Sequence, residues 1–304
     1  DSKKYESREE YLTPEAIIKN LYAEKETVHG ELGAQVYVDI KEDEGEPKYF
    51  RYKFEETYRV IAPYYIVYNI ELTNINVNNL DCYFEMIITD CNEDKNIGYV
   101  SVPSQKNILL AANAGSNGTS RFPILFIEGG SIKIRSRFSI LVKQFAQTQG
   151  SYEFYKKLKD LGNIQNLLIN NQPGYIKGNI YEVDNKQEKV VGYFEVSSVT
   201  EKRIYFNHND LDLNQPNYPY NCEIESELDF RDNDIWDGDR NDRRIIHSLL
   251  EISSPPWELF KITYIQEIDD EGGIIYIPVY TFVTPECGNV TYFSSVIKPD
   301  FWED

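Results

Sequence analysis

The segment 131–145 alternates apolar and charged side chains, and this alternation restricts the fold more than any other feature of the chain. The apolar positions at even spacing are Ile132, Ile134, Phe138, Ile140 and Val142, and the basic side chains between them are Lys133, Arg135, Arg137 and Lys143. A period of two is that of a β-strand, in which successive side chains point to opposite faces of a sheet. The segment therefore predicts a strand with one buried face and one face in water.

Other stretches of the chain also favour strands. The 304 residues include 24 Tyr against 3 Trp, and a tyrosine on a sheet can bury its ring while its hydroxyl stays in water. Further strands are predicted over 34–40, 50–54, 64–72, 83–89, 124–128, 175–183, 190–199, 203–207, 258–267, 274–276 and 279–283. The acidic turn 42–47 predicts a hairpin that joins the first two. Short strands with Asn- and Gly-rich joints are typical of an antiparallel sandwich or open barrel, so we expect a mainly β fold.

One short-to-medium helix is expected over about 151–161. Ser151 is placed to cap it, Glu153 complements its N-terminal dipole, and Gly162 is a natural stop. The segment 14–22 is either a short helix or an extended segment. A long irregular excursion, 209–256, separates the last strands from the rest.

The charge of the chain limits its partners. Fifty acidic and 31 basic residues give a net charge of −19, which repels phosphate backbones and anionic headgroups, so nucleic acid is not an expected partner. No apolar run approaches the roughly 18 residues that a membrane-spanning helix needs. The chain begins Asp1-Ser2 without Met, so we expect a mature or trimmed product whose export signal or lipid anchor lies upstream.

The four cysteines lack the paired spacing of zinc sites and thioredoxin-like motifs. If 83–90 is one strand, Cys82 and Cys91 are too far apart to bridge. Cys222 and Cys287 both lie in loops rich in Pro and Asn, and they are either a disulfide pair or free, half-buried thiols.

An acidic loop within the excursion is the one candidate ion site. Its carboxylates are Asp232, Asp234, Asp237 and Asp239, and clustered Asp oxygens around a Gly-permitted bend are the ligands that Ca²⁺ prefers. The ordered EF-hand spacing is absent and nearby arginines offset the charge, so a solvated acidic loop is the alternative. Trp236 and Trp257 are candidates for stacking on a sugar ring. Apart from this possible Ca²⁺, no cofactor is expected.

No residue pattern predicts catalysis. His29, His208 and His247 are far apart in the sequence, and none of the nucleophile elbow, zinc-protease, phosphate-loop and dinucleotide motifs occurs. We therefore expect a protein that is not an enzyme, with a hydrolase as the least favoured alternative.

Several ordered motifs give the chain a family resemblance. They are the helix segment 152–158, Gly178-Asn179-Ile180, Val190-Val191-Gly192-Tyr193-Phe194, Ser197-Ser198-Val199, Lys202-Arg203 and Lys298-Pro299-Asp300-Phe301-Trp302. Together they resemble the Bacteroidota lipoproteins of the domain of unknown function 4249 family. The family often has two close cysteines near the C-terminus, whereas this chain has only Cys287 there.

The resemblance implies a location and a partner. It implies an outer-membrane lipoprotein, surface-exposed or facing the periplasm and anchored through an upstream lipid, that is accessory to a TonB-dependent receptor or another outer-membrane complex. Its role would be nutrient uptake or outer-membrane assembly. It also implies that 1–33 is a linker from a preceding immunoglobulin-like domain, followed by one β-rich domain over 34–304 with 209–256 inserted. A module that captures a glycan, a peptide or a metal complex is the alternative function.

The residue types in these motifs favour packing. Gly178 and Gly192 suit places where two backbone segments approach closely or a strand bulges. Ser197, Ser198, Lys202 and Arg203 are either a satisfied strand end or the lining of a binding surface. Phe301 and Trp302 either fill a groove or form an exposed aromatic dock.

Overall fold

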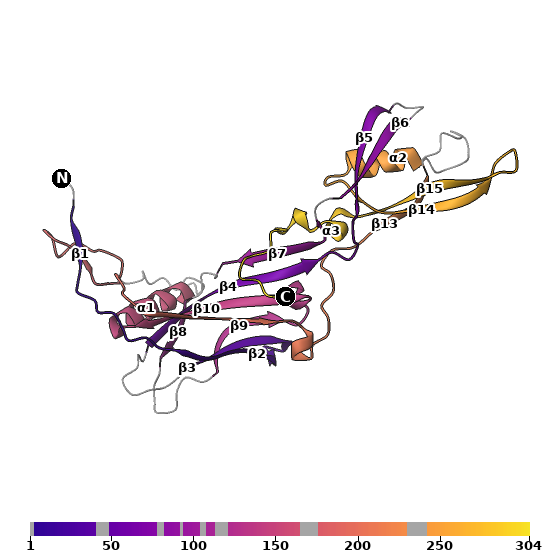
Figure 1. The fold of residues 1–304 in the computed structure, drawn as a ribbon. Coiled ribbons are helices and arrows are strands. Elements are labelled where there is room, and N and C mark those ends of the chain that lie inside the picture. The colour runs from indigo at the N-terminus through magenta and orange to yellow at the C-terminus, as the bar shows by residue number, and fades with distance from the viewer. Residues whose placement is uncertain are drawn as a thin grey trace. The chain divides into compact units, whose positions relative to one another are not determined.

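The protein is described by a computed structural model in which residues 3–40, 49–77, 82–91, 94–103, 108–112, 121–164, 176–229 and 242–304 are defined (Figure 1). The predicted mainly antiparallel β fold is confirmed, and of the two expected forms the structure has the sandwich. The chain forms two compact units. Unit 1 contains residues 1–58 and 101–216, and unit 2 contains residues 59–100 and 217–304.

Two sheets make up most of unit 1. The first has the order β2-β3-β9, with β2 (Ile18–Val28), β3 (Glu31–Ile40) and β9 (Phe122–Glu128). The second has the order β12-β10-β4-β7, with β12 (Val199–Phe206), β10 (Arg137–Gln147), β4 (Tyr49–Ile61), β7 (Ile97–Val102) and, beside β4, β8 (Leu109–Ala112). The end of β4 and most of β7 are counted with unit 2. A short pair of strands, β1 (Tyr5–Ser7) and β11 (Ile180–Glu182), lies outside these sheets.

The core of unit 1 lies between the two sheets. Val36 of β3 faces it from one sheet, and Phe50 of β4 and Phe138 of β10 face it from the other; all three side chains are fully buried. On β10, the even-numbered positions from 138 to 146 are buried, as the alternation predicts. These apolar stripes hold the sandwich together because each sheet covers the face that the other would leave in water.

The structure corrects several predicted elements of unit 1. The hairpin from 34–40 to 50–54 is wrong, because β3 pairs with β2 and β9 whereas β4 belongs to the other sheet. The alternation shows that each strand is half-buried, but it does not choose the pairing partner. Residues 132–134 form a turn of 3₁₀ helix (η1, Ile132–Ile134) in place of strand, although Ile134 is still buried. Segment 190–198 is outside any strand, and 14–17 is not helical.

The predicted helix is confirmed as α1 (Gln149–Ile164), which starts earlier and ends later than expected. Ser151 lies inside the helix, and the hydroxyl oxygen of Thr148 accepts the N–H of Ser151 at 3.3 Å, as a capping side chain does. Gly162 does not end the helix. Ser151 is completely buried and accepts a hydrogen bond from Gln147 of β10.

Unit 2 combines a sheet, a hairpin and short helices (Figure 1). Its sheet has the order β13-β15-β14, with β13 (Ile224–Asp229), β15 (Ile274–Val283) and β14 (Glu258–Ile268), and its hairpin joins β5 (Tyr68–Val77) and β6 (Cys82–Asp90). The helical segments are α2 (Asp242–His247), η3 (Ser248–Ile252), α3 (Pro285–Gly288) and η4 (Val290–Tyr292). Phe84, Ile246 and Phe282 bring hairpin, helix and sheet into one core cluster.

The excursion 209–256 is more regular than predicted. It contains η2 (Asn209–Leu211), β13, α2 and η3, and the two predicted strands 274–276 and 279–283 form the single strand β15. Residues 18–28, which the family resemblance places in a leading linker, form β2. Among the residues that the structure describes, no helix is both long and apolar enough to cross a bilayer.

Candidate functional site

The acidic loop and its tryptophan lie outside the described residues; these positions are Asp232, Asp234, Trp236, Asp237 and Asp239. Trp257 is described, and it is half-buried against the core cluster of unit 2, with its backbone N–H donating to Leu249. Within the described ranges, no group of three or more His, Cys, Asp or Glu side chains has an arrangement that could hold a metal ion.

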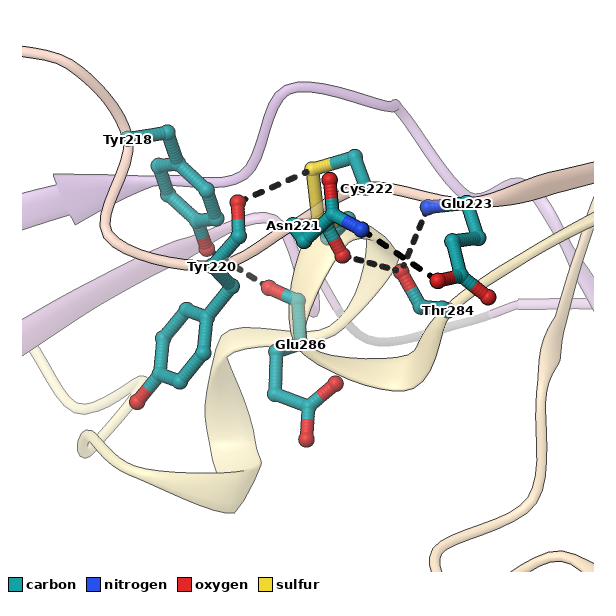
Figure 2. Close-up of a disulfide and its surroundings, with 8 residues drawn as sticks. Tyr218, Tyr220, Asn221, Cys222, Glu223, Thr284 and Glu286 are labelled. Carbon is teal, nitrogen blue, oxygen red and sulfur yellow. Dashed lines mark hydrogen bonds between the residues drawn. A yellow bond between two sulfur atoms is a disulfide. The ribbon is translucent and has the colours of Figure 1, made fainter.

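Cys222 and Cys287 form a disulfide in unit 2 (Figure 2). It ties the segment before β13 to α3, which follows β15, across a sequence separation of 65 residues. Cys287 is fully buried. Two hydrogen bonds join the same segments, because the N–H of Thr284 donates to the carbonyl of Glu223 and the N–H of Glu223 donates to the hydroxyl oxygen of Thr284. Cys82 and Cys91 lie at the two ends of β6.

Aromatic residues precede Cys222 and follow Cys287 in the chain, and they add further contacts. The Tyr218 hydroxyl donates to the backbone carbonyl of Glu286 at 2.6 Å (Figure 2), and the Tyr220 ring lies 5.1 Å from the ring of Phe293. The Tyr292 hydroxyl donates to Glu258. Burial raises the pKa of this hydroxyl most, and the Glu258 carboxylate raises it further. These contacts fix the chain around α3 and η4, so the disulfide region is a structural tie.

The C-terminal motif packs within unit 2. Trp302 is 5% exposed, and its ring lies edge-on at 5.1 Å from Tyr99 of β7. Phe301 is 40% exposed. The tryptophan therefore fills a groove, as the first of the two interpretations expects, while the phenylalanine is partly in water.

The glycines of the central motif permit a close approach of two backbone segments in unit 1. A Cβ atom on Gly178 would lie 1.6 Å from the carbonyl oxygen of Gly192, and Gly192 has a φ of +151°. Next to it, the side-chain amide of Asn179 donates to the carbonyl of Phe194 and its oxygen accepts the N–H of Phe194, each at 2.8 Å. These bonds satisfy both backbone groups of Phe194 although 190–198 joins no strand, because a side chain replaces the neighbouring backbone.

A buried ion pair lies directly after this contact. Arg51 of β4 donates to Glu195 at 3.0 Å, and both side chains are 11% exposed. The guanidinium carbon lies 4.5 Å from the ring centres of both Phe145 and Tyr155, so the cation is held between two aromatic faces. Glu195 also accepts hydrogen bonds from Gln147 and Ser197.

The pKa of Glu195 follows from these contacts. Burial raises the pKa of this carboxyl, but the hydrogen bond from Ser197 and the charge of Arg51 lower it more, so the net pKa is below the ordinary value. Burial and a hydrogen bond to Glu10 raise the pKa of the neighbouring Tyr193 to about 12. Tyr193 therefore stays neutral, and the cluster contains an ionised pair in which both carboxylate oxygens of Glu195 accept hydrogen bonds.

The remaining polar residues of the motif are also bonded inside unit 1. The backbone N–H of Ser198 donates to the hydroxyl of Thr13, Lys202 donates to the carbonyl of Lys19, and Arg203 donates to Ser139. They support the interpretation of a satisfied strand end. Glu10 and Arg51 are not recognisable as partners of the motif in the sequence, because nothing in a single sequence links positions so far from it.

An exposed apolar surface occurs at the distal end of the β14–β15 hairpin of unit 2. We define the distal hairpin as residues 264–278. Four of its side chains are largely in water: Tyr264 is 66% exposed, Ile268 74%, Ile274 58% and Tyr276 66%. Large side chains gathered in this way mark protein-contact surfaces more often than isolated exposed residues do. The sequence predicts these strands but not their exposure.

A family model described as a domain of unknown function (DUF4249) matches residues 1–203. The chain belongs to this family. The match ends within β12, so the DUF4249 region contains Arg51, Glu195 and the close glycines, whereas the disulfide and the distal hairpin follow it. No curated protein and no solved structure gives a significant match to the chain.

The part of the chain that matches the DUF4249 model differs from the part that follows it. The motif residues between 178 and 203 make hydrogen bonds and an ion pair inside unit 1. The exposed apolar residues of the distal hairpin lie in the part of this DUF4249 protein beyond the matched residues. The distal hairpin is therefore the candidate functional surface, as a site of contact with another macromolecule.

Proposed function

We propose that this DUF4249 chain is the noncatalytic ectodomain of an outer-membrane lipoprotein that acts beside a TonB-dependent receptor in nutrient uptake or outer-membrane assembly. The ectodomain contacts its partner through protein surface, and the membrane holds it through a lipid anchor upstream of these residues. The observation that carries the proposal is the exposed apolar distal hairpin on a unit that a disulfide closes.

Three features support the proposal. A disulfide between Cys222 and Cys287 fits an oxidising compartment outside the cytoplasm. The polar groups of the family motif, such as Glu195 and Arg203, are engaged with neighbours of the same unit. The net charge of −19 disfavours binding to nucleic acid or to anionic lipid, which leaves protein as the favoured partner.

Native copurification tests the proposal. The tagged full-length protein is expressed in its own cells, outer membranes are extracted with a mild detergent, and the extract is separated on a native gel and analysed by mass spectrometry. We expect the protein in the outer-membrane fraction, in a complex with a TonB-dependent receptor. A protein that fractionates with the cytoplasm, or migrates alone in every mild extract, would overturn the proposal.

A further inference from the structure

The distal hairpin continues the face of the sheet that forms the core of unit 2. In the antiparallel register Ile262 pairs with Tyr280, Tyr264 with Pro278, Gln266 with Tyr276 and Ile268 with Ile274, so these eight side chains share one face. At the inner end of this face Tyr280 is 7% exposed and belongs to the core cluster. Two positions further out along β14, Tyr264 on the same face is 66% exposed. The apolar face therefore extends beyond the part that the core of unit 2 covers, and such an exposed face is typical of a contact surface.

The distal hairpin also has no third strand among the described residues. β13 pairs with β15 from Ile224↔Val283 to Asp229↔Val279, and its described residues end there. From Pro278 to Ile274, β15 pairs only with β14 within the described part of the chain. A two-stranded ribbon of this kind is marginally stable in water by itself, and it gains stability when its apolar face is covered.

The charge at the tip of the hairpin indicates what covers it. Between Lys261 and Lys298 the sequence contains no Lys or Arg, and its acidic residues are Glu267, Asp269, Asp270, Glu271 and Glu286. Asp269 shapes the turn, since its carboxylate accepts the N–H groups of Glu271 and Gly273. Asp270 and Glu271 are exposed at the tip. The apolar face is therefore next to a concentrated negative charge.

Resting on the proposed function, we propose that the distal hairpin docks in an apolar groove, rimmed by Lys or Arg, on a different protein. The basic rim complements the acidic tip, and the groove covers Tyr264, Ile268, Ile274 and Tyr276. A second copy of this chain is disfavoured because its acidic tip and net charge of −19 repel the first. An anionic lipid surface is disfavoured for the same reason.

Site-specific photocrosslinking in cells tests this inference. Tyr276 is replaced by the photoreactive p-benzoylphenylalanine in the full-length protein, and Tyr65 of the same unit, which is 62% exposed but outside the hairpin, serves as the matched control position. We expect a defined adduct with one other protein from position 276 and none from position 65. The crosslinked partner peptide, mapped by mass spectrometry, is expected to be apolar and to lie near Lys or Arg residues in the partner.

A charge reversal completes the experiment. Asp270→Lys together with Glu271→Lys in the crosslinking protein should lower the adduct yield on the order of tenfold, because it removes the attraction to the basic rim. Asp270 and Glu271 are exposed, so the variant should fold, and an unchanged melting temperature verifies this. An unaffected yield would overturn the inference.

Other outcomes also count against the inference. Adducts with a second copy of the chain, adducts with lipid only, or a partner peptide without nearby basic residues would each overturn it. If the native complex is present but position 276 gives no adduct, this docking surface is wrong and the proposed function stands. If no outer-membrane complex is present, both fail.

Discussion

The Arg51–Glu195 cluster of unit 1 and the distal hairpin of unit 2 place opposite kinds of side chain in unexpected surroundings. In the cluster an ionised pair is 11% exposed, and in the hairpin Tyr264 and Tyr276 are 66% exposed. Both observations require a reason, because charged side chains are seldom buried and large apolar patches are seldom exposed. The buried charges are paired with each other, and neighbours of the same unit hold them in place. The exposed rings have no such role and point to a partner.

The two units also differ in how they are stabilised. Among the described residues, the core cluster of unit 1 contains 20 buried apolar residues and that of unit 2 contains 9, and the smaller core is the one with a disulfide. All three tryptophans, Trp236, Trp257 and Trp302, lie in unit 2, so tryptophan fluorescence reports the unfolding of unit 2. Amide hydrogen exchange in β10 reports unit 1. These two measurements allow the comparison to be tested one unit at a time.

The largest effect is expected from Arg51→Met in unit 1. This change leaves Glu195 buried without its cation, and breaking a buried pair in this way costs about 3–5 kcal/mol. Amide protection in β10 should fall accordingly. Lys143→Met is the matched control on β10, because its pair with Glu55 is partly exposed and such pairs contribute below about 1 kcal/mol. Equal effects of the two changes would show that the cluster does not stabilise unit 1.

The next largest effect is expected from Cys222→Ser together with Cys287→Ser in unit 2. Losing the disulfide should lower the free energy of unfolding by about 2–4 kcal/mol, since the closed loop no longer restricts the unfolded chain. Urea unfolding followed by tryptophan fluorescence measures the change. The wild-type protein should lose stability on reduction, whereas the variant should not respond to reductant. A loss that appears in β10 exchange and not in fluorescence would contradict the assignment of the disulfide to unit 2.

A smaller effect, with a control of opposite sign, is expected from two glycine substitutions in unit 1. Gly178→Ala places a methyl group against the backbone of Gly192 and should destabilise unit 1 by about 1–3 kcal/mol. Gly162→Ala in α1 meets nothing within 4 Å and should stabilise it by about 0.5–1 kcal/mol. Amide exchange of the two variants gives both values. A neutral Gly178→Ala would mean that the close approach is not required.

The smallest effect concerns pH and Glu195. Its pKa in the folded protein lies below the ordinary glutamate value of about 4.3, so its ionisation stabilises the fold above that pH. This contribution is lost as the pH falls through the lower folded pKa. The difference in free energy of unfolding between wild type and Glu195→Gln should therefore shrink on going from pH 6 to pH 3. A difference that grows on acidification would contradict the depressed pKa.

The sequence predicts the parts of the fold that depend on local patterns. The alternation in 131–145 places the buried positions of β10 correctly, and the helical spacing after Ser151 finds α1. The 34–40 to 50–54 hairpin fails because pairing is decided by sheets assembled from distant segments. The same reason hides Arg51, whose partner Glu195 is 144 residues away.

The candidate surface was hidden for a different physical reason. The exposed face has the residue types of a buried strand face, namely Tyr264, Ile268, Ile274 and Tyr276. The alternation of residue types cannot show that the core of unit 2 covers this face only as far as Tyr280. The absence of basic residues from 262 to 297 is visible in the sequence, but it becomes informative only next to that uncovered face. Burial and exposure are properties of the assembled unit.

The most direct measurement of the central claim is the migration of a hairpin variant on a native gel. Tyr264→Ser together with Tyr276→Ser is compared with wild type and with Tyr65→Ser, after mild extraction of outer membranes. We predict that wild type and Tyr65→Ser migrate in the receptor complex, while the hairpin variant migrates alone with an unchanged fluorescence-detected unfolding transition. A folded hairpin variant that remains in the complex would contradict the account.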